Sequence, residues 1–281
     1  MRDTPLVGQA IGPDRIPVMA RLGVMMRFAM VRLTRLVPVF AVVVALAGCA
    51  TPPPSTDPEA LADFNQTNDP LEPTNRFFYR VNDGLDTYLL RPVAVAYRQV
   101  PGAVRRPIHN LLVNMSTPIT FANNVLQTKP TRAGTSMMRF LINSTAGVGG
   151  LFDVATGLGY PDHDTDFGVT LALWGAGDGP FLFLPVLGPS NPRDATGFAG
   201  NAVLDPFTWV SFGGANALRY SKFGAGAVDA RERVLDPIDN VKKTALDPYA
   251  TFRSLYRQNR QSTIDATRAD DHATVPAWFS R

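Results

Sequence analysis

Apolar residues recur at helical spacing along most of the chain and predict several amphipathic helices. The first stripe consists of Leu71, Phe78, Val81, Leu85, Tyr88 and Leu89. Its helix is expected to stop or bend at Arg91–Pro92, because proline lacks a backbone donor and restricts the residue before it. A second helix is predicted over 102–126 with an interruption at Pro118, and a third over 131–143. These apolar stripes at helical spacing indicate an all-α protein.

Asp-Pro pairs stand where several helices are expected to begin. Asp69 is predicted to cap the first helix, with Pro70 in its first position and Glu72 near the positive end of its dipole. The same pair recurs at Asp205–Pro206, Asp236–Pro237 and Asp247–Pro248. A last stripe follows over 249–256, and residues 259–281 are expected to form a polar tail.

The most apolar run after residue 49 is 181–187, Phe-Leu-Phe-Leu-Pro-Val-Leu. A spanning helix needs about 20 apolar residues, so this run does not cross a bilayer. It is either a buried segment or an apolar wall against which lipid tails lie. The glycines between 147 and 159 lack the third glycine of a dinucleotide-binding fingerprint, so they indicate tight turns and close backbone contacts.

Residues 1–48 have the organisation of an export signal, because arginines precede the short apolar run 36–47 and small residues follow it. The order Leu46-Ala47-Gly48-Cys49 resembles a bacterial lipobox, in which the cysteine is acylated and becomes the new N-terminus. Residues 49–67 then form the lipidated N-terminus and a proline-rich tether. Ala50, in place of aspartate, favours the outer membrane, on its periplasmic side.

The export signal also accounts for the charge of the chain. Six arginines and two acids precede Cys49, so their removal changes the net charge from +3 to −1. Nucleic-acid binding loses its support, because it needs a basic face to neutralise phosphates. In a protein held at a membrane by lipid, the amphipathic helices face either a core or the membrane interface, and the sequence leaves both open.

No motif for catalysis or metal binding is complete. The cluster Asp162-His163-Asp164-Thr165-Asp166 has neither zinc spacing nor the glycine of a calcium loop, so a solvated acidic turn is expected. The chain has three histidines, and Gly-x-Ser-x-Gly is absent. His109 is predicted to be a surface or boundary residue. We therefore expect no enzyme, no cofactor and no metal.

Several separate motifs resemble those of the MlaA/VacJ family of outer-membrane lipoproteins. The first lies near the predicted first helix and contains Asn68, Asp69, Pro70, Glu72, Pro73, Asn75 and Arg76. The second contains Asp166, Phe167 and Gly168, followed by Gly179 and Pro180. The third contains Leu184, Pro185, Gly188, Pro189, Arg193 and Asp194. The resemblance assigns residues 68–258 to one lipid-transport domain.

The resemblance implies a non-enzymatic protein that moves mislocalised phospholipids from the outer leaflet toward a soluble periplasmic carrier and so maintains lipid asymmetry. It implies a ring-like bundle of amphipathic helices with Gly/Pro-rich bends, embedded in one leaflet, with an amphipathic channel and trimeric porins as partners. Two other classes stay open: a scaffold lipoprotein that packs against porins, and a periplasmic lipid hydrolase.

Candidates for the lipid path come from the apolar run. They are Phe181, Phe183, Leu184, Val186 and Leu187. The stretch Gly147–Gly159 is a candidate flexible gate beside them. Arg105–Arg106 either meets phosphate headgroups or forms a solvated helix end.

Overall fold

The computed structural model describes Thr56, Phe64 and residues 67–269, and these are mostly helical. The export signal, Cys49, most of the tether and the last part of the tail lie outside the described residues. No helix in the described part is long and apolar enough to cross a membrane.

The first helical segment continues through the proline at which it was expected to stop or bend. Helix α3 (Glu72–Leu85) leads into a π-helix, η1 (Asp86–Leu90), which leads into α4 (Arg91–Arg98). Pro92 has no backbone donor, and its ring would clash with the carbonyl four residues earlier in a regular helix. The wider π turn directly before α4 accommodates both features, so the chain stays helical as far as Arg98.

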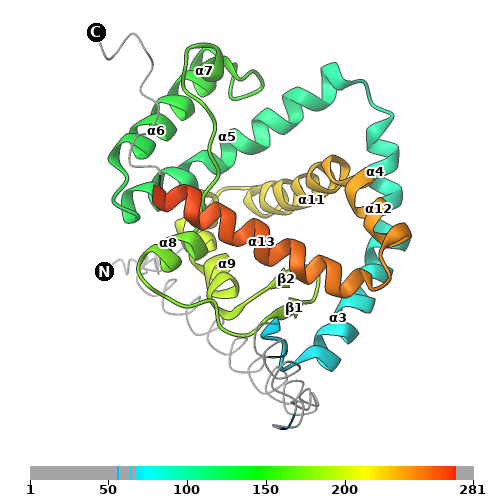
Figure 1. Ribbon diagram of the computed structural model, residues 1–281. Helices are drawn as coiled ribbons and strands as arrows, with labels where there is room; N and C mark the ends of the chain where they lie inside the picture. Colours follow the sequence, from blue (N-terminus) through cyan, green and yellow to red (C-terminus); the bar gives the residue numbers. More distant parts are fainter. Residues whose placement is uncertain (1–55, 57–63, 65–66, 270–281) are drawn as a thin grey trace, which may run out of the picture. The chain divides into compact units, whose positions relative to one another are not determined.

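Helix α5 (Gly102–Leu126) has the predicted bounds, but it contains Pro107 and Pro118 without interruption. The expected break at Pro118 is therefore wrong. Helix α6 (Pro130–Thr145) follows after a short connection and packs along α5, as Figure 1 shows. It extends the predicted third helix by a residue or two at each end.

A small β-hairpin corrects the expectation of an all-α protein. Strand β1 (Leu182–Leu184) pairs antiparallel with β2 (Gly188–Ser190), with Phe183 opposite Pro189. Before the hairpin lie the short helices α7 (Val154–Gly157) and α8 (Phe167–Leu173); α9 (Pro192–Leu204) and α10 (Pro206–Trp209) follow it. Helix α8 packs closely on α9, because Gly168 and Gly197 let the two backbones approach.

The C-terminal part consists of α11 (Ala215–Arg233), α12 (Leu235–Thr244) and α13 (Pro248–Ala269). Helix α13 continues past residue 258, where a polar tail was expected. In Figure 1 it runs alongside the hairpin and α9, and it contacts α8, α12 and β2. The expected end of the helical part is therefore about ten residues too early.

The Asp-Pro pairs begin helices in two cases. Asp205 accepts a hydrogen bond from Phe207 N at the start of α10, and Asp247 accepts one from Ala250 N at the start of α13. Asp236 lies inside the first turn of α12. Asp69 does not cap α3, whose N-cap is Leu71 without a side-chain hydrogen bond. The Asp69 carboxylate is instead buried among polar side chains.

Burial is inverted relative to an ordinary globular protein. In the described part of the chain, twenty polar or charged residues are buried against twelve apolar ones, while twenty-eight large apolar side chains are exposed. The first stripe shows the inversion, because Tyr88 and Leu89 are 86% and 64% exposed whereas Asn75 on the same helical segment is buried. The second half of the first stripe, from Val81 to Leu89, thus faces away from the protein interior, whereas Tyr249 of the last stripe is buried.

Candidate functional site: the polar interior and its cavity

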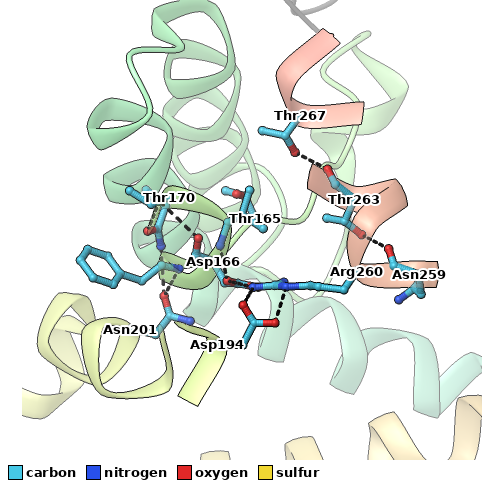
Figure 2. Close-up of polar contacts among 12 residues, drawn as sticks. Thr165, Asp166, Thr170, Asp194, Asn201, Asn259, Arg260, Thr263 and Thr267 are labelled. Carbon is cyan, nitrogen blue, oxygen red and sulfur yellow. Dashed lines mark hydrogen bonds and ion pairs between the residues drawn. The ribbon is translucent and has the colours of Figure 1, made fainter. Parts of the chain in front are cut away.

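Arg260 of α13 joins two acids that belong to different sequence motifs (Figure 2). Its guanidinium donates to Asp166 at 2.6 and 2.7 Å and to Asp194 at 2.9 Å. Asp166 also caps α8 by accepting from Val169 N at 3.0 Å. This cluster ties α8, α9 and α13 together through charge-assisted hydrogen bonds.

The electrostatics of this cluster favour the ionised form of Asp194. Burial alone would raise the pKa of Asp194, but hydrogen bonds from Arg260 and Tyr256 outweigh it and lower the pKa. Burial and the bond to Asp194 raise the pKa of Tyr256, so its hydroxyl remains a donor, at 2.5 Å. Asn191 completes the cluster by capping α9 at Asp194 N and donating to Tyr256.

A second polar cluster joins α3 to the hairpin. The Nδ2 atom of Asn75 donates to Asp69 at 2.7 Å and to Phe181 O at 2.9 Å, and its Oδ1 atom accepts from Phe183 N at 2.8 Å. Asp69 also accepts from the Tyr249 hydroxyl and, at 2.8 Å, from Arg253. The first motif therefore holds the hairpin and α13 in place, and it contains no catalytic arrangement.

The other motif residues have structural positions around these clusters. Asn68 donates to Gly179 O at 2.7 Å, and Arg76 pairs with Glu72 and with Asp247. Arg193 contacts Asp194, and the ring of Phe167 packs against Trp174. A Cβ on Gly168 would approach Asp194 Oδ1 to 2.6 Å, and Gly179 and Gly188 have positive φ. The motif prolines lie before or inside α3 and the hairpin; they are Pro70, Pro73, Pro180, Pro185 and Pro189.

The five lipid-path candidates divide between the interior and the surface. Phe181 and Phe183 are buried in an aromatic cluster with Tyr249. Leu184 is partly exposed, whereas Val186 and Leu187, at the hairpin turn, are 68% and 47% exposed.

Close backbone contacts constrain part of the candidate gate, and an ion pair holds Arg105 in place. A Cβ on Gly147 would collide with Phe152 O, and one on Gly150 would collide with Asn114, so the backbone is closely packed there. Arg105 forms an ion pair with Glu232 at 2.5 Å and is partly buried, so the solvated helix end expected there is wrong for Arg105.

A cavity of about 340 Å³ lies between α5, α6, α11 and the loop before α8. It is lined by His109, Leu112, Val113, Ser116, Thr117, Thr120, Ser136, Arg139, Asp162, His163, Asp164, Gly226 and Asp229. Its volume falls within the range of small-molecule sites, about 300–1,000 Å³. Sequence reasoning missed this site, because it treated His109 and the 162–166 cluster as separate surface features.

Hydrogen bonds fix the two histidines in the cavity wall. His109 Nδ1 lies 2.8 Å from Asp229 Oδ2, and His163 Nε2 lies 2.8 Å from Asn124 Nδ2. No group of histidine, cysteine, aspartate and glutamate in the described residues has the arrangement of a metal site. One signal was available in the sequence: the wall residues on α5 recur at helical spacing and turn from apolar to hydroxylated between Leu112 and Thr120.

The Asp164 side chain lines the cavity and is exposed to solvent, although nearby protein atoms partly desolvate its carboxyl group. This desolvation, together with the charges of Asp166 and Asp162, raises its pKa. A raised folded-state pKa means that the ionised carboxylate destabilises the fold above that pKa, and that this cost disappears at low pH. Asp164→Asn should therefore raise the melting temperature at pH 7, but only slightly, because solvent reaches the exposed carboxylate and offsets most of its cost. The gain should vanish near pH 3, where residue 164 is neutral in both the wild type and the variant. Calorimetry in detergent at both pH values would measure it, and equal melting temperatures at pH 7 would contradict it.

Comparisons with known proteins agree on one family. The MlaA lipoprotein family model matches residues 67–263. The MlaA intermembrane phospholipid transport lipoprotein of Haemophilus influenzae is 33% identical over 79% of this chain and 87% of its own length. The Escherichia coli K12 protein of the same name is 32% identical over 76% and 82%. A solved structure, described as the structural basis for maintenance of bacterial outer membrane lipid asymmetry, aligns with a TM-score of 0.62 and 31% identity over 70% of this chain and 98% of its own. The chain therefore belongs to the MlaA lipoprotein family.

Proposed function

We infer that the protein is an outer-membrane lipoprotein that moves mislocalised phospholipids from the outer leaflet toward a periplasmic carrier and so maintains lipid asymmetry. Its MlaA relatives are named for intermembrane phospholipid transport. The observation that carries the inference is the inverted burial, with polar side chains inside and large apolar side chains outside. A lipid-transport protein needs both surfaces, because headgroups require polar contacts and acyl chains do not.

The exposed apolar side chains support a position within one leaflet. Leaving a large apolar side chain in water gives up about 1.5–3 kcal/mol, and exposed patches of this kind mark membrane or protein contacts. The described helices are too short or too polar to span. A helical ring in one leaflet, with lipid outside and a polar passage inside, satisfies both conditions. Trimeric porins would cover part of the apolar surface.

The hairpin turn and the cavity are the two parts of the proposed lipid path. Val186 and Leu187 expose apolar surface suited to acyl chains. The cavity offers hydroxyl and charged groups suited to a headgroup. A photoactivatable phospholipid tests this path when it is crosslinked to the purified protein and mapped by mass spectrometry. Crosslinks to the cavity wall are expected, and crosslinks confined to outward residues such as Tyr88 and Leu89 would contradict a path through the protein.

Tryptophan fluorescence tests the position in the membrane. Trp174 and Trp209, two of the exposed large apolar side chains, are 57% and 69% exposed. In vesicles whose acyl chains carry bromine or a nitroxide, we expect their emission to fall by about half or more, while aqueous acrylamide has little effect. Trp209→Phe should remove part of the quenchable signal. Strong quenching by acrylamide without quenching by the labelled chains would contradict a leaflet position.

Cys49 is proposed as the lipid-attachment site that holds the protein at the membrane. Two or more acyl chains anchor stably, since each buried CH₂ contributes about 0.8 kcal/mol. In Cys49→Ala, incorporation of a fatty-acid probe should be lost, and the export signal 1–48 should remain attached. Cys49→Ser serves as the isosteric control and should behave in the same way. Normal processing of Cys49→Ala would show that another residue defines the mature N-terminus.

A further inference from the structure

The cavity wall offers hydrogen-bond acceptors beside apolar side chains. Ser116 and Thr117 donate their hydroxyl protons to the carbonyls of Leu112 and Val113 at 3.1 and 3.0 Å. Their oxygen lone pairs are left as acceptors on the face of α5 that lines the cavity. From His109 to Thr120 this face extends about 16 Å, at 1.5 Å per residue. A ligand here meets hydroxyl oxygens beside apolar side chains, over a length that suits a lipid headgroup and its glycerol.

The charges of the wall favour a cation over an anion. Three carboxylates line the cavity, on Asp162, Asp164 and Asp229, against one arginine, Arg139. The Arg139 side chain is only 5% exposed, and it already donates to Thr156 at 2.8 Å and to Tyr160 O at 2.6 Å. It also pairs with Asp153 at 3.2 Å and approaches Asp162 to 3.4 Å. Little of its donor capacity remains for a phosphate.

The three carboxylates differ in how far their charge is balanced. Asp229 contacts His109 and lies 3.4 Å from Arg233, and Asp162 lies near Arg139. Asp164 forms no ion pair with any lysine or arginine in the described part of the chain. Two of the charged groups that act on it are the acids Asp162 and Asp166, and the third is Arg260, which is bound to Asp166. In the free protein the charge of Asp164 is therefore balanced mainly by solvent and not by an ion pair.

A buried amide with one unpaired atom lies behind the same wall. Asn124 is fully buried, and its Nδ2 atom lies 3.0 Å from Ser136 Oγ and 2.8 Å from His163 Nε2, both cavity-lining residues. Its Oδ1 atom has no hydrogen-bond partner. Exchanging the amide oxygen and nitrogen would leave the other atom unpaired at that position. Buried polar atoms are normally paired, so the polar contacts behind the wall are incomplete, although Asn124 itself does not line the cavity.

We propose that the cavity binds the primary ammonium of an aminophospholipid headgroup, with Asp164 as its ion-pair partner and the α5 hydroxyls as acceptors of its remaining protons. This assignment rests on the proposed transport function and adds the class of lipid that the site selects. Leu112 and Val113 supply an apolar wall for the glycerol and the first methylenes. A headgroup without an ammonium leaves the Asp164 carboxylate unpaired in the cavity and binds less tightly.

Native mass spectrometry of the full-length protein in detergent tests the assignment. It would compare phosphatidylethanolamine with phosphatidylglycerol of the same acyl chains. We expect the wild type to prefer phosphatidylethanolamine about tenfold, the discrimination typical of a charge-assisted hydrogen bond. Asp164→Asn should reduce the ratio to about one, and Asp164→Glu should retain a preference. Asp178→Asn is the matched control, because Asp178 is exposed as Asp164 is but lies outside the cavity wall.

The outcomes separate the assignment from the proposed function. Equal binding of both lipids by the wild type, or an unchanged preference in Asp164→Asn, would overturn the headgroup assignment and leave lipid transport standing. Binding of neither lipid would overturn both. A second experiment measures the binding of free ethanolamine and free spermidine. If these free amines bind in an Asp164-dependent way while phosphatidylethanolamine does not, the site recognises a soluble amine and the lipid assignment is wrong.

Discussion

Replacing Arg260 with glutamine is expected to lower the free energy of unfolding by about 3–5 kcal/mol, the cost of breaking a buried ion pair from one side. Asp194 is 7% exposed and would keep its charge without its main partner. Asp166 is 34% exposed, so solvent would compensate part of its loss. Most of the effect therefore comes from Asp194. Chemical unfolding in detergent micelles, followed by circular dichroism, would measure the change.

Arg268→Gln provides the matched control on the same helix. Arg268 pairs with Asp265 at 3.3 Å, but both side chains are more than half exposed. Exposed pairs contribute about 0–1 kcal/mol, so this variant should unfold almost as the wild type does. If the two variants lost equal stability, the Arg260 cluster would not hold α8, α9 and α13 together in the way described.

Replacing Asn75 with alanine is expected to cost about 2–4 kcal/mol and to loosen the hairpin from α3. The asparagine is 2% exposed and satisfies Asp69, Phe181 O and Phe183 N at once. Each buried group left without its partner costs about 1–3 kcal/mol, although water entering the space recovers part of this. Unfolding experiments and amide hydrogen exchange at Phe183 would detect both effects.

Asn259→Ala is the control for that variant, because Asn259 lies on the exposed face of α13. A surface change to a good helix former should alter stability by no more than about 0.5 kcal/mol. Unchanged exchange at Phe183 in Asn75→Ala would show that the three hydrogen bonds do not hold the hairpin.

Several helices were predictable from the sequence because their apolar periodicity is a local property. The bounds of α5 agree with the prediction, and α3, α6 and α13 lie where a stripe was found, whereas no pattern predicted α7, α8, α9 or α11. The direction of the stripes was not predictable in the same way. A stripe such as Val81, Leu85 and Leu89 has the same spacing whether it faces a core or lipid. Polar residues on the opposite face, such as Asn75 and Asp86, decide which way the stripe faces. The partners that bury these polar residues are distant in the sequence.

Separation along the sequence also explains why the sequence did not predict the polar sites. Asp69 has the local signature of a helix cap, yet its carboxylate is used by Tyr249 and Arg253, some 180 residues later. Arg260 stands in a polar segment that resembles a tail, and its role depends on two acids brought together by the fold. The cavity likewise joins α5, α6 and α11, so no single stretch of sequence contains it. Composition and periodicity report what a segment is made of, whereas these sites depend on which segments meet.

A deletion strain tests the transport account most directly. Phospholipid in the outer leaflet would be measured on intact cells with an amine-reactive probe that does not cross the membrane, or by sensitivity to added phospholipase. The account predicts that surface phospholipid rises on deletion and returns to the wild-type level with the wild-type gene but not with Cys49→Ala. A deletion strain whose surface phospholipid equals that of the wild type would contradict it.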